Sequence, residues 1–156
     1  MKTPIKIHSV HQVLAHSYLA HFTALVVGLI IDYFFPLRVM SATLISLGPL
    51  LLILATVLIF WSQRTSDRTK KHRRDPENLT AREFCKGPYC YMRSPTHIGL
   101  ALLVLGFGFL ANSVIIVCVS LVIFLITRYT FVYQQEKILS ERYGKPYEDY
   151  KKIIKF

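Results

Sequence analysis

Cysteine is scarce in this sequence, and the few cysteines lack the spacing of a metal or redox site. They are Cys85, Cys90 and Cys118, with no CxxC pair among them. Cys85 and Cys90 lie beside a polar motif that is expected to face the reducing cytosol, where disulfides rarely persist. We therefore expect neither a disulfide nor a cysteine-based metal site.

Several other signals are missing, and each absence disfavours a class of protein. The N-terminal histidines have no carboxylate or cysteine beside them before Asp32, so a metal site is the weaker interpretation. The opening segment lacks the basic region and apolar run of a cleavable signal peptide. No dinucleotide-binding fingerprint is present, which argues against a reductase. The basic residues are not interleaved with a stacking surface, so nucleic acid is not an expected partner.

Long apolar runs are what the chain does contain. Hydrophobic residues make up 53% of it, beside nineteen Lys and Arg and nine acids, and they are concentrated in segments. Residues 42–61 carry no charge, and a helix of that length crosses a hydrocarbon core of about 30 Å. Residues 18–36 are a second candidate span, and 1–17 fit a short interfacial helix that leads into it.

Residues 98–126 are too long for one simple crossing, because a single helix would measure about 43 Å. Lys and Arg crowd both flanks, with nine in 64–93 and seven in 128–155. The positive-inside tendency places both flanks in the cytoplasm. We therefore predict a hairpin of two helices, 95–111 and 113–133.

The predicted fold class is an all-α integral membrane protein, a single domain over 1–156 with four transmembrane helices. The spans are 18–36, 42–61, 95–111 and 113–133, with a cytosolic loop at 62–94 and a cytosolic helical tail at 134–156. Both termini are expected in the cytoplasm, since the external turns carry only Arg38. The basic charge indicates contact with anionic membrane lipids. Gly99, Gly106 and Gly108 predict close helix approach in the span 95–111, and Gly48, beside Pro49, predicts a kink in 42–61 that serves packing.

Two polar motifs border the predicted hairpin. Residues 87–99 read GPYCYMRSPTHIG, and residues 135–152 read QEKILSERYGKPYEDYKK. The pair resembles the isoprenylcysteine carboxyl methyltransferase and phospholipid methyltransferase family, whose pattern is GPYxxxRHPxYxG, a transmembrane pair, then EExxLxxxFGxxYxxY. The matched stretches, with the hairpin between them, cover a little under half of the chain.

The resemblance implies methyl transfer from S-adenosylmethionine to a lipid-like or isoprenylated acceptor, at a carboxylate or an amine, on the cytosolic membrane face. It implies catalytic roles for Arg93, His97 and Glu136. The implied cofactor-binding residues are Tyr89, Arg93, Ser94, Pro95, His97, Gly99, Gln135 and Glu136. Arg128 is the expected contact for the lipophilic acceptor, and no metal is implied.

The residue types suit the parts of that cofactor. Arg93 can form a forked, charge-assisted pair with a carboxylate, and Glu136 can accept from an ammonium or from ribose hydroxyls. Tyr89 offers a flat face to adenine or to a cation. His97 is the candidate base for an amine acceptor, which must first lose a proton.

The chain departs from the family pattern at Ser94, His97 and Gln135, where the family has His, Tyr and Glu. Two alternatives therefore stay open. A non-catalytic member would keep the fold and bind a lipid or a partner, with Arg93 reaching to phosphates and Glu136 paired with Lys137 or Arg128. The other alternative is a membrane reductase related in its C-terminal part.

Overall fold

The computed structural model describes residues 10–72 and 80–154, and the regular elements in that part of the chain are all helical. The long helices are α1 (Val10–Phe34), α2 (Ala42–His72), α4 (Pro95–Leu110), α5 (Val114–Thr127) and α6 (Tyr133–Tyr143). The shorter elements are α3 (Ala81–Phe84), the 3-10 turn η2 (Gly87–Cys90), the π-helical turn η3 (Arg128–Val132) and α7 (Lys145–Ile153). The predicted all-helical class is confirmed. Most of the predicted interfacial segment, at 1–9, lies outside the described residues, as do 73–79 of the predicted loop and the last two residues of the predicted tail.

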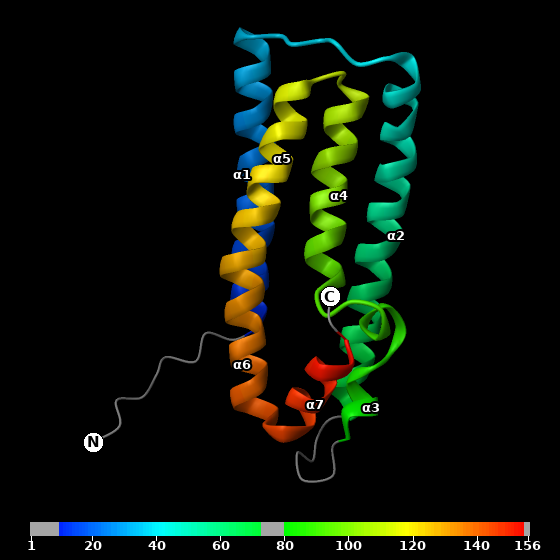
Figure 1. Ribbon diagram of the computed structural model, residues 1–156, viewed down its shortest axis with the longest axis vertical. Helices are drawn as coiled ribbons and strands as arrows, with labels where there is room; N and C mark the ends of the chain where they lie inside the picture. Colours follow the sequence, from blue (N-terminus) through cyan, green and yellow to red (C-terminus); the bar gives the residue numbers. More distant parts are fainter. Residues whose placement is uncertain (1–9, 73–79, 155–156) are drawn as a thin grey trace, which may run out of the picture.

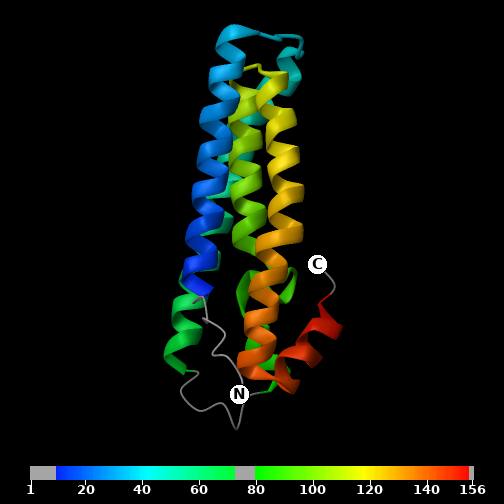
Figure 2. The same cartoon turned by 90° about the vertical axis from the view of Figure 1, so that its left-hand side faces the viewer.

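The long helices lie side by side in one bundle, with α5, η3 and α6 forming one continuous helical path (Figure 1). Helix α4 packs against both α2 and α5, and α1 packs against α5. The connection between α1 and α2 and the turn between α4 and α5 meet at one end of the bundle. There the Asn112 side-chain oxygen accepts from the Met40 backbone N–H at 3.1 Å, and the Leu37 carbonyl accepts from the Val114 N–H at 3.3 Å. Figure 2 shows α6 and α7 meeting at the opposite end.

Three of the described helical stretches are long and apolar enough to cross a membrane, namely Gln12–Phe34, Ala42–Ser66 and Val114–Tyr143. Helix α4 is also apolar, but its 16 residues give a length of only about 24 Å. Pro95 is the first residue of α4. Proline suits this position, because its φ is already helical and the N–H that it lacks would have no partner within the helix. Asn112, with φ of 52°, turns the chain just past its end. The multi-pass membrane class is thus supported by three helices, with α4 as a shorter fourth.

Buried positions in the described bundle are rich in small polar residues, while many large apolar side chains face outward. On α1 the buried stripe includes Ser17, His21 and Asp32, although the helix as a whole is apolar. Phe22 and Leu125, by contrast, are 65% and 53% exposed. An apolar surface of this extent is unfavourable in water but suits hydrocarbon, where helix interfaces use small and polar residues.

Glycines allow α2 and α4 to approach closely, as the sequence predicts. A Cβ atom on Gly48 would lie 2.7 Å from the Leu110 backbone nitrogen, and one on Gly106 would lie 3.2 Å from the Gly48 carbonyl oxygen. Gly108 similarly faces Val117 of α5, where a Cβ would lie 3.0 Å from the backbone nitrogen. These glycines therefore serve helix packing.

The prediction that Cys85 and Cys90 would not form a disulfide is wrong. The structure joins them in a disulfide with a Cα–Cα distance of 4.4 Å. The chain reverses between them at Gly87, whose φ of 56° is readily adopted by a residue without a Cβ. This local reversal brings together two cysteines whose sequence spacing has no motif. Cys118 is free and exposed on α5.

Substitution of Gly48 by alanine tests the α2–α4 contact. The new methyl group would meet the backbone of α4, so we expect a loss of about 1–3 kcal/mol in the free energy of unfolding. Thermal unfolding in detergent micelles measures the change. Gly28→Ala is the matched control, because its Cβ would lie 3.4 Å from the nearest atom and should be tolerated. Equal stability of the two variants would show that α2 and α4 are not packed this closely.

Candidate functional site

The two polar motifs meet beside the first turn of α4. His97, 2% exposed, lies between α1 and α6. Its Nε2 is 3.0 Å from Gln135 Oε1, and its Nδ1 is 2.8 Å from the hydroxyl of Ser17. Thus the hairpin of α4 and α5 brings together His97 and Gln135, which are separated by 38 residues in sequence. We call Ser17, His97 and Gln135 the His97 cluster.

An ion pair joins the same two motifs, between Arg93, four residues before His97, and Glu136, the residue after Gln135. Arg93 Nη1 lies 3.1 Å from Glu136 Oε1, and both side chains are largely buried, at 15% and 16% exposed. Lys151 of α7 approaches the other carboxylate oxygen at 3.6 Å. Glu136 is therefore paired with Arg93 and Lys151, whereas the alternative interpretation of the sequence pairs it with Lys137 or Arg128. Arg93 and Glu136 are a preformed pair of opposite charges.

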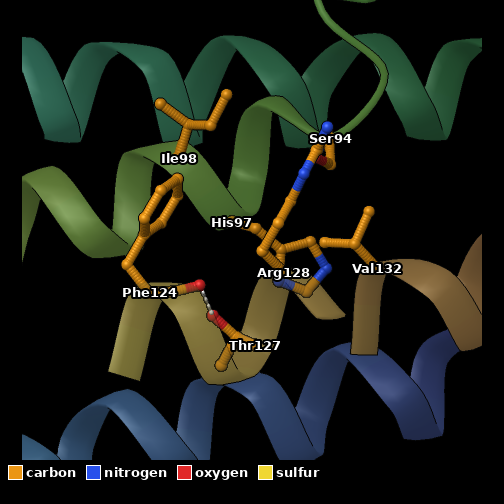
Figure 3. Close-up of a pocket in the computed structure, with 7 residues that line it drawn as sticks. All are labelled: Ser94, His97, Ile98, Phe124, Thr127, Arg128 and Val132. Atoms are coloured by element: carbon orange, nitrogen blue, oxygen red, sulfur yellow. Dashed lines mark hydrogen bonds between the residues drawn. The ribbon is translucent and has the colours of Figure 1, made fainter. Parts of the chain in front are cut away.

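A pocket of about 310 Å³ opens between α4 and the α5–η3 helix (Figure 3). Its polar lining comes from Ser94, His97, Thr127 and Arg128, and its apolar lining from Ile98, Phe124 and Val132. Arg128 extends across the pocket towards the start of α4, where Nη1 donates to Ser94 Oγ at 3.4 Å. The pocket therefore combines one guanidinium, two hydroxyls and an imidazole with apolar walls. Such a lining fits a molecule with a polar or anionic end and an apolar body.

Tyr89 belongs to a second polar group on the other side of α4. Ser62 of α2 contacts both the Tyr89 hydroxyl, at 3.0 Å, and the Thr96 hydroxyl, at 2.7 Å. The Tyr89 carbonyl accepts from the Tyr150 hydroxyl at 2.6 Å. These contacts fix the η2 segment between α2 and α7, so the loop before α4 is held at both of its sides.

An aromatic core supports the C-terminal motif. Phe84, Tyr147, Tyr150 and Ile154 are buried together, and Tyr143 packs edge-on against Phe84 with ring centroids 5.3 Å apart. Helix α7 thereby packs onto α3 and presents Lys151 to Glu136. The tyrosines of the C-terminal motif thus anchor α7 beside the ion pair.

The structure brings together most of the residues that the sequence selects. Arg93, Ser94, His97, Arg128, Gln135 and Glu136 gather around the start of α4 in the pairs described above. Pro95 is buried as the first residue of α4. Gly99 faces away from this group, since its Cβ would lie 2.6 Å from Ile59 Cγ1 of α2.

Sequence reasoning missed three groups that complete the site. They are Ser17 on α1, Ser62 on α2 and the apolar walls of the pocket at Phe124 and Val132. Ser17 and His21 are both buried and lie four residues apart on a mostly apolar helix, a helical spacing that puts polar groups on one face. That spacing is the signal that would have identified the contribution of α1.

The comparisons with known proteins agree with the two motifs. Residues 43–146, more than half of the chain, match the phospholipid methyltransferase family. The chain therefore belongs to this family of methyltransferases, as its sequence motifs predict. Comparison with curated proteins and with solved structures gives no match. The matched segment runs from α2 into α7 and does not include α1.

A double-mutant cycle on Arg93 and Glu136 tests whether the pair links the two motifs. We expect Arg93→Ala and Glu136→Ala to be coupled by about 1–2 kcal/mol in unfolding free energy, because a largely buried charged contact exceeds an exposed one. Reversible denaturation in mixed micelles measures the four proteins. The matched control is the exposed pair Lys152 and Asp149, at 3.1 Å, whose coupling should be close to zero. Additive effects at Arg93 and Glu136 would contradict the contact.

Proposed function

We propose that this protein transfers a methyl group from S-adenosylmethionine to a lipid-like or isoprenylated acceptor at the cytosolic membrane face. The main support is the meeting of the two motifs, in the Arg93–Glu136 pair and the His97–Gln135 hydrogen bond. In the family pattern these motifs stand on either side of a transmembrane pair. Because α4 and α5 run to the far end of the bundle and back, motifs that are separated in sequence by these two helices come into contact.

The residues around the start of α4 fit the proposed cofactor in charge and hydrogen-bonding type. S-adenosylmethionine supplies an electrophilic methyl group on a sulfonium when it is bound. Arg93 would hold its carboxylate, Glu136 would accept from its ammonium or its ribose hydroxyls, and Gln135 would contact a ribose hydroxyl. Ser94, at the start of α4, adds a buried hydroxyl. Tyr89 lies on the other side of α4, where its hydroxyl is 3.0 Å from that of Ser62. The cofactor would separate Arg93 from Glu136 or bind at the edge of the pair.

Arg128 and the pocket between α4 and α5 would receive the acceptor. The guanidinium suits a carboxylate or phosphate at the head of the acceptor, and Ile98, Phe124 and Val132 suit its chain. A carboxylate acceptor needs no base, so positioning and exclusion of water can provide much of the acceleration. An amine acceptor would have to pass a proton to His97, both of whose ring nitrogens are already hydrogen-bonded. This arrangement favours the carboxylate.

The proposed topology has four spans, α1, α2, α4 and α5–α6, with both termini in the cytoplasm. The site end of the described bundle carries Arg93, Arg128 and Lys151, while the α4–α5 turn at the far end carries no Lys or Arg. The positive-inside tendency supports placing the site end in the cytoplasm. Helix α4 is short for a span, and its partners α2 and α5 would cover it on two sides.

A non-catalytic lipid-binding member of the family is the second candidate. The observation in its favour is that Arg93 and Glu136 already neutralise each other, which a purely structural link would also do. Under this candidate the pocket still binds an amphiphile, but no cofactor is needed.

Titration with S-adenosylmethionine separates these candidates. We expect the purified protein to bind the cofactor and to transfer labelled methyl groups to a lipid acceptor in proteoliposomes. Arg93→Ala and Glu136→Ala should each weaken cofactor binding by about 1.5–3 kcal/mol, as for a lost charged hydrogen bond. Lys152→Ala, an exposed cation on α7, is the control and should leave affinity unchanged.

Two outcomes would count against the methyltransferase proposal. Absence of binding by the wild-type protein at millimolar cofactor would favour the lipid-binding candidate. Binding of NADPH in its place would favour the reductase.

Arg128→Gln tests the assignment of the pocket to the acceptor. The variant keeps a donor but removes the charge, so we expect KM for an anionic acceptor to rise about tenfold or more while cofactor affinity changes little. Steady-state kinetics at saturating cofactor, with an anionic and a neutral acceptor of equal chain length, measure the difference. An equal effect on both acceptors would contradict a charge contact at Arg128.

A further inference from the structure

Helix α1 contributes to the site although it lies before the segment that matches the family. The match begins at residue 43, whereas Ser17 is on α1. Ser17 is fully buried, and its hydroxyl is 2.8 Å from His97 Nδ1. The Ser17 backbone carbonyl also accepts from His21 Nδ1 at 2.8 Å. The Ser17 hydroxyl therefore contacts His97, while the Ser17 backbone carbonyl is bonded within α1.

The hydrogen-bond partners of His97 determine which ring nitrogen carries the proton. The ring is 2% exposed and neither of its partners is charged, so the neutral form is favoured. Gln135 Oε1, at 3.0 Å, is an acceptor only, and so the ring donates to it from Nε2–H. Nδ1 is then an acceptor and receives the Ser17 O–H. The three groups form one directed chain, from Ser17 through His97 to Gln135.

We propose that Ser17 is a positioning residue for the site: by donating to Nδ1 it holds His97 as the Nε2–H tautomer and so fixes the orientation of Gln135. With its carbonyl turned to His97, the Gln135 amide keeps its N–H donors for a ligand oxygen. Loss of Ser17 leaves a buried imidazole nitrogen without a partner, which favours ring flips and the other tautomer. The link to the ligand rests on the proposed function, whereas the tautomer does not.

The Ser17–His97 hydrogen bond could also serve only to hold α1 against α4. The test must therefore report which ring nitrogen of His97 carries the proton. Histidine labelled with ¹⁵N in the full-length protein, assigned with a His97→Gln variant, reports the tautomer through long-range ¹H–¹⁵N correlation. We expect wild-type His97 to show a protonated Nε2 and a bare Nδ1. Ser17→Ala should give mixed tautomers and weaken S-adenosylmethionine binding by about three- to tenfold. Ser17→Thr keeps the hydroxyl and should show the wild-type tautomer and the wild-type cofactor affinity.

Ser120→Ala is the matched control. Ser120 is also buried, on α5, and its hydroxyl donates to the Ala101 carbonyl at 3.3 Å rather than to the site. This variant should change neither the tautomer nor the affinity. A wild-type Nδ1–H tautomer, or an unchanged tautomer in Ser17→Ala, would overturn the proposal. A changed tautomer with unchanged cofactor affinity would overturn the link to the ligand. A tautomer that depends on Ser17 in a protein without cofactor binding would support the positioning role and reject the proposed function.

Discussion

The need to pair buried polar groups is the constraint on which this bundle depends. Its outer surface is apolar, so the interior is the place for serine, threonine and histidine side chains, and most of those that the structure describes find a partner there, while His21 Nε2 and Asp32 Oδ1 have no hydrogen-bond partner among the described residues. The pairs join helices that are distant in sequence: Ser17 to His97, Ser62 to Thr96, and His97 to Gln135. The network that satisfies the interior is thus also the network that assembles the site.

Two of the three positions at which this chain departs from the family pattern contact each other. His97 and Gln135 stand where the family has Tyr and Glu, and they contact each other. Ser94 stands where the family has His, and it contacts Arg128. A neutral imidazole and a neutral amide satisfy each other here without a buried charge. Arg93 and Glu136 match the family pattern, and in this chain they form an ion pair.

Much of the fold could be predicted from the sequence because apolar length and charge asymmetry are strong signals in a membrane protein. The uncharged run at 42–61 lies within α2, and Pro95 marks the start of α4. The helical course of α2 as far as His72 was harder to predict, since its charged second half carries no apolar periodicity. The disulfide between Cys85 and Cys90 was missed because it depends on a local chain reversal at Gly87 and on no motif.

The candidate site was predictable only in part, for a related reason. Arg93, His97, Gln135 and Glu136 lie in recognisable motifs, but motifs do not show which side chains face each other. Gly99 lies in the same motif and faces α2 instead. Ser17 lies in no motif, and its role follows from its burial opposite His97.

The π-helical turn at Arg128–Val132 affects how related sequences should be compared with this one. A π-helical turn closes its hydrogen bonds over five residues, so it contains more residues than an α-helical turn of similar rise. If the helix from Gln135 back to Arg128 is treated as regular, with 3.6 residues per turn, residues before the π-helical turn are assigned to the wrong face by about one position. The cation that reaches the pocket from this helix is Arg128, the first residue of the π-helical turn. Alignments across this helix should therefore allow a one-residue shift here, because a gap-free comparison pairs residues that point in different directions.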